Sequence, residues 1–194
     1  MCGRYSLDYD LKNIIIRYKA TKSIKEFQAR DEIFPTDLAP VVVRDQENMI
    51  AIMKWGFAPG FAKQPLINAR GETIDIKPTF KNSFYNKRCI IPVSSFFEWE
   101  NIDGKKIRRR ISISNEKIFS LAGLYDVFQD KEGKEYAAYT IITTEANKEI
   151  KVIHHRMPVI IPKDMENIWL DRNNRNIKEL KDLLRPYKKD MVIL

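Results

Sequence analysis

Cysteine stands directly behind the initiator methionine, in the opening stretch MCGRY. A small side chain at this position lets methionine aminopeptidase remove Met1, so we expect Cys2 to become the N-terminal residue. It would then carry a free amine and a thiol on neighbouring carbons, which is a reactive pair. Because the second residue of a chain is usually mobile and dispensable, Cys2 is the first candidate for chemistry.

The only two histidines are adjacent, in the stretch KVIHHRMPVII. Any imidazole chemistry must come from this segment, although single histidines are more often structural. Pro158 argues against a helix here, and alternation along an extended chain places His154 on one face with Arg156. His155 then points to the opposite face with Met157. This alternation favours His154 as the acid–base group.

Two further stretches combine polar groups in patterns that suit catalysis. In PVSSFFEWE, Glu98 shares a strand face with Phe96, and a desolvated carboxyl there has a raised pKa and can act as an acid or base. A solvated strand edge is the alternative. In LINARGET, Asn68 and Arg70 project to one side with Glu72 and suit a reacting oxygen and a phosphate. A loop held by its own polar contacts is equally consistent.

Composition points to a polyanionic partner. The formal net charge is +8, which favours nucleic acid, although simple solubility explains it as well. The stretch MKWGFAPGFAK, with Trp55, places aromatic residues near positive charge, as a stacking platform for unpaired bases does, but such aromatics are also typical of a core.

Chain length and cysteine content limit the protein class. With 194 residues the sequence predicts one domain, 1–194, and no apolar run approaches the roughly 20 residues that span a bilayer. Without a signal-peptide core or a cysteine framework, a reducing cytoplasm is the expected compartment. Cys89 alternates with Ile91 and Val93, which predicts a buried, inert thiol. The scattered cysteines and histidines do not favour a zinc site, and we expect no metal or other cofactor.

Hydrophobic periodicity predicts the elements that must position these residues. A short helix is expected over 10–18, and helices over 163–170 and 177–184. Strand pairs are expected over 39–45 with 49–55, over 88–100 with 107–114 around the hairpin signal Asp103-Gly104, and over 117–128 with 136–144. Together they predict an α+β fold, a mostly antiparallel, barrel-like β-sheet with a few flanking helices.

Six stretches in order resemble one family closely. They are MCGRY, APVV, WGFAP, NARGET, RCIIPVSSFFEW and HHRMPVII, and they span residues 2 to 161. The sequence resembles the SOS response-associated peptidase (SRAP) family, also described as abasic-site processing proteins.

The resemblance implies a DNA-repair protein that senses and shields abasic sites in single-stranded DNA. It implies a covalent DNA–protein crosslink, a thiazolidine formed by Cys2 after Met1 removal, with lyase and self-directed thiol-peptidase activities in the family's range. By resemblance Asn68 positions the reactants, Glu98 and His154 transfer protons, and the DNA is bound by Arg4, Trp55, Arg70, Thr144 and Arg156. The expected protein is a cytoplasmic monomer that is nucleoid-associated when bound to DNA and has no membrane partner.

The sequence departs from the family pattern at two positions. Ser95 stands where a glycine is usual, and Phe61 replaces a second tryptophan, so the groove is expected to differ in fine shape. Three other functions stay open on the residues: a cysteine peptidase with Cys2 as nucleophile, an N-terminal-nucleophile amidotransferase, and a non-catalytic binder of single-stranded DNA.

Overall fold

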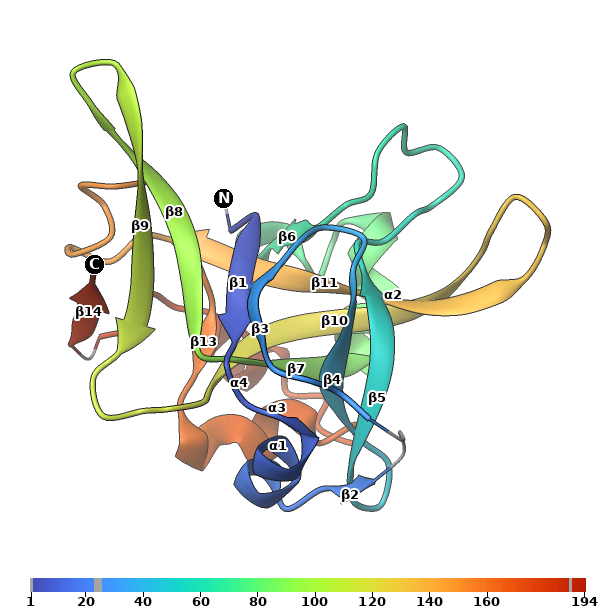
Figure 1. Cartoon of the computed structure of the whole chain (residues 1–194). Helices are drawn as coiled ribbons and strands as arrows, with labels where there is room; N and C mark the ends of the chain where they lie inside the picture. Colours follow the sequence, from blue (N-terminus) through green and yellow to red (C-terminus); the bar gives the residue numbers. More distant parts are fainter. Residues whose placement is uncertain (1, 23–25, 189) are drawn as a thin grey trace.

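The fold is built from two β-sheets that share a core, with short helices at their ends (Figure 1). The computed structural model describes residues 2–22, 26–188 and 190–194. Met1, whose removal the sequence predicts, lies outside the described residues.

The larger sheet contains a closed barrel. Its five barrel strands are β4 (Leu38–Arg44), β5 (Asn48–Trp55), β7 (Arg88–Val93), β10 (Phe119–Gln129) and β11 (Glu135–Glu145). Antiparallel pairing runs from β11 through β10, β7 and β4 to β5, and β5 returns parallel to β11, which closes the ring. Shorter strands extend it: β2 (Thr21–Lys22), β6 (Asn68–Arg70), β12 (Arg156–Pro158) and β13 (Ile160–Ile161). This architecture confirms the predicted α+β, barrel-like fold.

The smaller sheet carries the beginning of the chain. Its strand order is β14 (Met191–Ile193), β9 (Lys105–Ile113), β8 (Ser95–Ile102), β1 (Arg4–Leu7) and β3 (Arg30–Ile33). The β8–β9 hairpin turns at Asp103-Gly104, as predicted, with φ of 50° and 79° at the two turn residues. Figure 1 shows this hairpin projecting well beyond the body of the molecule.

The three strand pairs predicted from hydrophobic patterning are present, with one correction. The stretch 88–100 is not one strand but two, because β7 lies in the barrel and β8 in the smaller sheet. The chain changes sheets at Ser94, whose backbone N–H donates to the Ser6 carbonyl at 2.8 Å and whose Oγ accepts from the Asp8 N–H at 2.9 Å. Continuous apolar patterning on both sides hides this break in the sequence.

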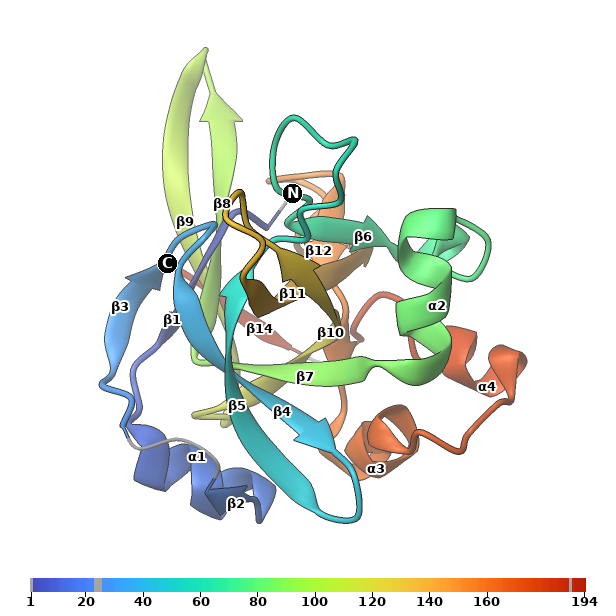
Figure 2. The same ribbon diagram turned by 90° about the vertical axis from the view of Figure 1, so that its right-hand side faces the viewer.

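Three of the helices confirm predicted positions, and a fourth, α2 (Pro78–Asn86), was not predicted. The first, α1 (Leu11–Tyr18), is capped by the Asp10 carboxylate, which accepts from the Asn13 N–H. Before β7 lies α2, and near the C-terminus lie α3 (Glu166–Leu170) and α4 (Ile177–Asp182), both beside the barrel (Figure 2). None of these helices, within the described part of the chain, is long and apolar enough to cross a membrane.

Strand β10 contains a glycine whose lack of a side chain permits close packing. A Cβ atom on Gly123 would lie 2.2 Å from Cδ1 of Ile91, 3.0 Å from the Thr140 carbonyl oxygen and 3.1 Å from Sγ of Cys89. Cys89 is fully buried there, and burial raises the pKa of its thiol, as expected of an inert core cysteine.

We therefore expect Gly123→Ala to lower the free energy of unfolding by about 1–3 kcal/mol, the usual cost of overpacking a core. The matched control is Gly60→Ala, because a Cβ there meets no atom within 4 Å. Urea denaturation of both variants measures the difference. Equal stability of the two would show that the barrel relaxes freely around β10.

Candidate active site

Cys2 lies just before β1, and the strand register determines its surroundings. In the antiparallel pairing of β1 with β8, Arg4 is opposite Phe97 and Tyr5 is opposite Phe96, so the chain before β1 runs alongside Glu98. Cys2 is fully buried, and its Sγ lies 3.7 Å from the Arg4 carbonyl oxygen. Burial raises the pKa of the Cys2 thiol, and the negative charge of Glu98 raises it further. The thiol is thus protonated at neutral pH.

Asn68 holds the Cys2 backbone from the barrel side. It begins β6, which pairs parallel to β11 with Asn68 opposite Ile141. Its Nδ2 donates to the Cys2 carbonyl oxygen at 3.0 Å. Its Oδ1 is buried, and no group in the described structure donates to it. Since a buried amide oxygen normally accepts a hydrogen bond, this atom is available to a ligand.

Glu98 lies on β8 and is only 2% exposed. Burial raises the pKa of its carboxyl, which therefore keeps its proton to a higher pH than an exposed glutamate. This agrees with the predicted desolvated carboxyl rather than a solvated strand edge. Cys2, Asn68 and Glu98, far apart in the sequence, thus meet at one end of β1.

The two histidines do not alternate as predicted. Strand β12 begins only at Arg156, and the preceding turn stacks the imidazole rings of His154 and His155 with centroids 4.4 Å apart. His154 is half-buried, and its Nδ1 lies 3.0 Å from the Arg156 backbone nitrogen and 3.1 Å from the Arg156 carbonyl oxygen. Burial lowers the pKa of His154. His155 is exposed rather than packed inside.

The predicted phosphate-binding arginines differ in their partners. Arg4 pairs with Glu32 at 3.2 Å and lies over the rings of Phe34 and Trp99. Arg156 is 8% exposed and forms two hydrogen bonds to Glu72, at 2.6 and 2.9 Å. This pairing lowers the pKa of the Glu72 carboxyl.

Arg70, at the end of β6, is exposed. It makes no ion pair within the described residues and is therefore better placed than Arg4 or Arg156 to meet a phosphate. The sequence separates Glu72 and Arg156 by 84 positions and gives no signal that they pair.

Trp55 lies in the core and not at the surface, where a stacking platform for bases would need it. It is fully buried, its indole N–H donates to the Ile67 carbonyl at 3.0 Å, and its ring stacks near that of Tyr139. The exposed aromatic residue in this region is Phe61, with 75% of its surface accessible, in the loop between β5 and β6. Thr144 is also buried, at 6% exposed, and its contact with DNA stays a prediction.

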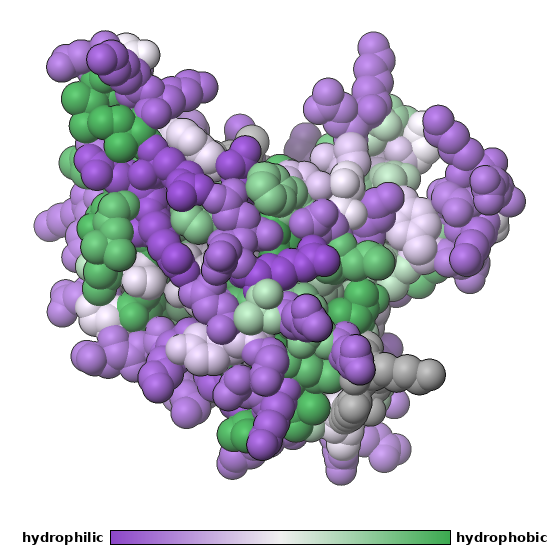
Figure 3. Space-filling model, viewed as in Figure 1, coloured by the Kyte–Doolittle hydropathy of each residue, from purple (hydrophilic) through white to green (hydrophobic). Residues whose placement is uncertain are grey.

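The face that carries the site is hollowed. Figure 3 shows a notch between the projecting β8–β9 hairpin and the part of the molecule that includes the β5–β6 loop, and β1 begins within it in Figure 1. Hydrophilic residues cover most of this face. Within the described chain, no three histidine, cysteine or acidic side chains come together closely enough to hold a metal ion.

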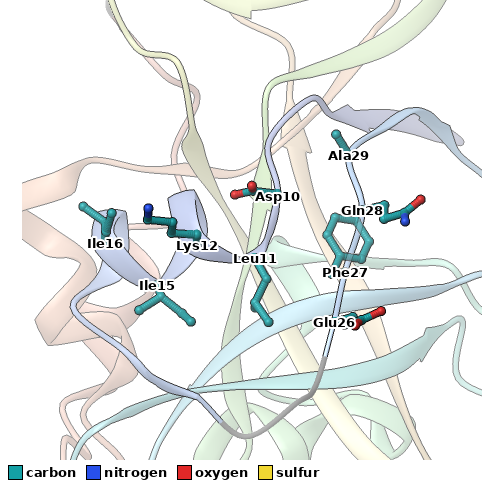
Figure 4. Close-up of a pocket in the computed structure, with 9 residues that line it drawn as sticks. All are labelled: Asp10, Leu11, Lys12, Ile15, Ile16, Glu26, Phe27, Gln28 and Ala29. Carbon is teal, nitrogen blue, oxygen red and sulfur yellow. The ribbon is translucent and has the colours of Figure 1, made fainter.

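A larger cavity lies away from this site. It has a volume of about 680 Å³ and separates α1 from the extended segment 26–29 (Figure 4). Ile15, Ile16 and Phe27 supply much of its lining, and its charged residues are Asp10, whose carboxylate caps α1, Lys12 and Glu26. Because neither a cysteine nor a histidine lines it, we place the candidate active site at Cys2 instead.

A family model described as SOS response associated peptidase (SRAP) matches residues 1–194. The chain belongs to the SRAP family. Its relatives include abasic site processing protein YoaM of Bacillus subtilis, 38% identical, with 98% of this chain and 88% of the relative covered. YoqW of Bacillus phage SPbeta, which bears the same description, is 36% identical over 98% of this chain and 89% of the relative.

Solved structures support the SRAP fold. A protein from Bacteroides thetaiotaomicron superposes with a TM-score of 0.87 at 27% identity, covering 100% of this chain and 92% of the other. A protein from Bordetella bronchiseptica superposes with a TM-score of 0.84 at 25% identity, covering 99% of this chain and 98% of the other. The predicted family and fold are therefore confirmed.

The buried Glu98 of this SRAP protein makes its stability depend on pH. An unfolded glutamate titrates near about 4.3, and the folded pKa is higher because of burial. Between these values the folded state binds more protons than the unfolded state, so the free energy of unfolding falls as pH rises. We expect Glu98→Gln to lack this decline, and hence to gain stability relative to the parent from pH 4 to pH 8.

Urea denaturation across this pH range measures the effect. The matched control is Glu132→Gln, which removes a carboxyl from the exposed β10–β11 turn. If the Glu98 and Glu132 variants follow the parent equally, the Glu98 carboxyl is not perturbed by its surroundings.

Proposed function

We propose that this protein senses abasic sites in single-stranded DNA and shields them by a covalent bond through Cys2, after Met1 has been removed. The observation that carries the proposal is the junction of Cys2, Asn68 and Glu98 at the start of β1. The names of the relatives, abasic site processing proteins, support the same substrate. The active protein would act as a monomer through the single SRAP domain, residues 1–194.

The chemistry begins with the α-amine of Cys2. A terminal amine has a pKa of about 7.7–8.0, so a substantial fraction is neutral at physiological pH. An abasic deoxyribose exists partly as an open-chain aldehyde, and the amine adds to its carbon to give a carbinolamine. Loss of water then leaves a Schiff base. Burial raises the pKa of the Glu98 carboxyl, which makes it suited to donate the proton that the departing oxygen needs.

The thiol completes the reaction. Sγ of Cys2 adds to the imine carbon, forming the C–S bond, while the thiol proton goes to the imine nitrogen. The product is a five-membered thiazolidine, and the whole reaction releases one water molecule. Because the ring removes the imine that would drive β-elimination, it protects the strand from cleavage. Lyase activity is then the side reaction that occurs when the ring fails to close.

The surroundings of Cys2 support this sequence of steps over a cysteine peptidase. A peptidase needs a thiolate, but burial raises the pKa of the Cys2 thiol. The amine-first route uses the thiol only after the imine has formed. His154 is the second proton-transfer group, in sugar opening or crosslink reversal, and the exposed Phe61 can stack on a neighbouring base.

A denaturing gel tests the proposal directly. We expect the parent to give a shifted band with an abasic oligonucleotide and none with an intact one. Cys2→Ala should abolish the stable band, and Cys2→Ser should give only a labile adduct because oxygen forms a weaker ring. Intact mass should equal protein without Met1 plus DNA less one water. A stable thiazolidine on protein that verifiably retains Met1 would overturn the mechanism.

Alanine variants of the two histidines should differ in their rates of crosslink formation or reversal. At saturating protein we expect His154→Ala to slow crosslink formation or reversal about 10²–10⁴-fold, the usual contribution of a positioned acid or base. His155→Ala should keep near-normal rates because its exposed ring does not hydrogen-bond Arg156 as His154 does. Rate constants on an abasic oligonucleotide measure both. A severe rate defect in the His155 variant alone would show that the wrong ring has been assigned.

A further inference from the structure

A second cavity lies beside Asn68, where β6 and β12 both meet the end of β11. Its volume is about 340 Å³, and its lining residues are Arg70, Glu145, Ala146, Lys151, His155 and Arg156. Asn68 begins the strand that ends at Arg70, so one lining residue of the cavity lies two positions along β6 from Asn68. Lys151 and His155 have no role in the proposed chemistry.

The cations that line this cavity differ in how far they are neutralised. Arg156 is paired with Glu72 and also donates to the Thr143 carbonyl at 2.8 Å. Arg70 and Lys151, in contrast, are exposed and form no ion pair with any described residue. Only one carboxylate, that of Glu145, lines the cavity. The cavity therefore carries uncompensated positive charge.

His155 adds a neutral donor to this pair. Its ring is exposed but held in place by stacking on His154 at 4.4 Å. Repulsion between protonated forms of the two stacked rings lowers the pKa of His155, so its ring is neutral near pH 7 and offers one N–H. The cavity thus combines a guanidinium, an ammonium and an imidazole. These are N–H donors from which the phosphate oxygens of nucleic acids accept hydrogen bonds.

We propose that this cavity binds one backbone phosphate of the DNA strand adjacent to the abasic sugar, and that Lys151 and His155 are positioning residues that bind it together with Arg70. The inference rests on the proposed function and adds the place where the strand is held. A phosphodiester fits better than a base, since no phenyl, phenol or indole ring lines the cavity. Holding this phosphate keeps the strand bound beside Cys2, without any contact to the reactive carbon of the neighbouring sugar.

The test uses DNA that cannot react. An oligonucleotide with a tetrahydrofuran abasic analogue has no aldehyde, so fluorescence anisotropy measures binding alone. We expect Lys151→Gln to weaken binding and to flatten the log–log salt dependence by about 0.7, one phosphate contact on a single strand. The matched control is Lys148→Gln, which removes the same charge from the same turn but lines a different hollow. Its slope should equal that of the parent.

Single neutral linkages identify the phosphate. A methylphosphonate replaces one phosphodiester at a time on either side of the analogue. At one of the two positions we expect the methylphosphonate and Lys151→Gln to change the free energy of binding non-additively, because each change removes the same contact. His155→Ala should be non-additive at the same position, and Glu145→Gln should tighten binding by removing the opposing charge.

The outcomes separate this inference from the proposed function. Equal salt slopes for the Lys151 and Lys148 variants, or full additivity at both linkages, would overturn the phosphate site. A parent protein that binds the analogue in this way but forms no crosslink with a true abasic strand would instead overturn the proposed chemistry.

Discussion

Chemistry at the first residues of a chain requires that a normally mobile segment be held still, and the pairing of β1 does this. The strand lies between β8 and β3 in the smaller sheet, and Tyr5 and Leu7 are fully buried. The Tyr5 hydroxyl is 2.6 Å from that of Tyr139 on β11, which joins the smaller sheet to the barrel. Cys2 thereby reaches Asn68 on the barrel side and Glu98 on the sheet side. A shift of one residue in the β1–β8 register would turn Cys2 away from both.

Burial then determines the charge state of the site. It raises the pKa of Cys2 and of Glu98 and lowers that of His154, so each shift favours the uncharged form. Such a site suits the exchange of protons with a neutral aldehyde, where an acid and a base are needed in turn. It does not suit a thiolate attacking a peptide bond. The same low dielectric makes the Asn68 oxygen, which has no donor among the described residues, costly to keep, and a ligand that donates to it would relieve this cost.

Local signals in the sequence were sufficient for the hairpins and for the burial of Glu98, but not for the way the candidate residues are arranged. Asp103-Gly104 predicts its turn because these residues adopt positive φ, and Glu98 was found because alternation placed it among aromatic side chains. The break at Ser94 was missed because it depends on hydrogen bonds to Ser6 and Asp8, about 90 residues away. The burial of Trp55 and the stacking of the two histidines likewise depend on tertiary contacts that hydrophobic periodicity does not encode.

The structure shows how much of the net charge of +8 is available to DNA near the site. Several basic residues around the site are already paired: Arg4 and Arg108 both with Glu32, Arg110 with Asp8, and Arg156 with Glu72. Such pairs shape the walls of the site but offer little net charge to DNA. Under the covalent capture that we propose, many phosphate contacts are not needed, because the chemical bond supplies the lifetime of the complex. It needs alignment, and a small number of uncompensated cations beside Asn68 meets that requirement better than a broadly basic surface, which would hold undamaged DNA as well.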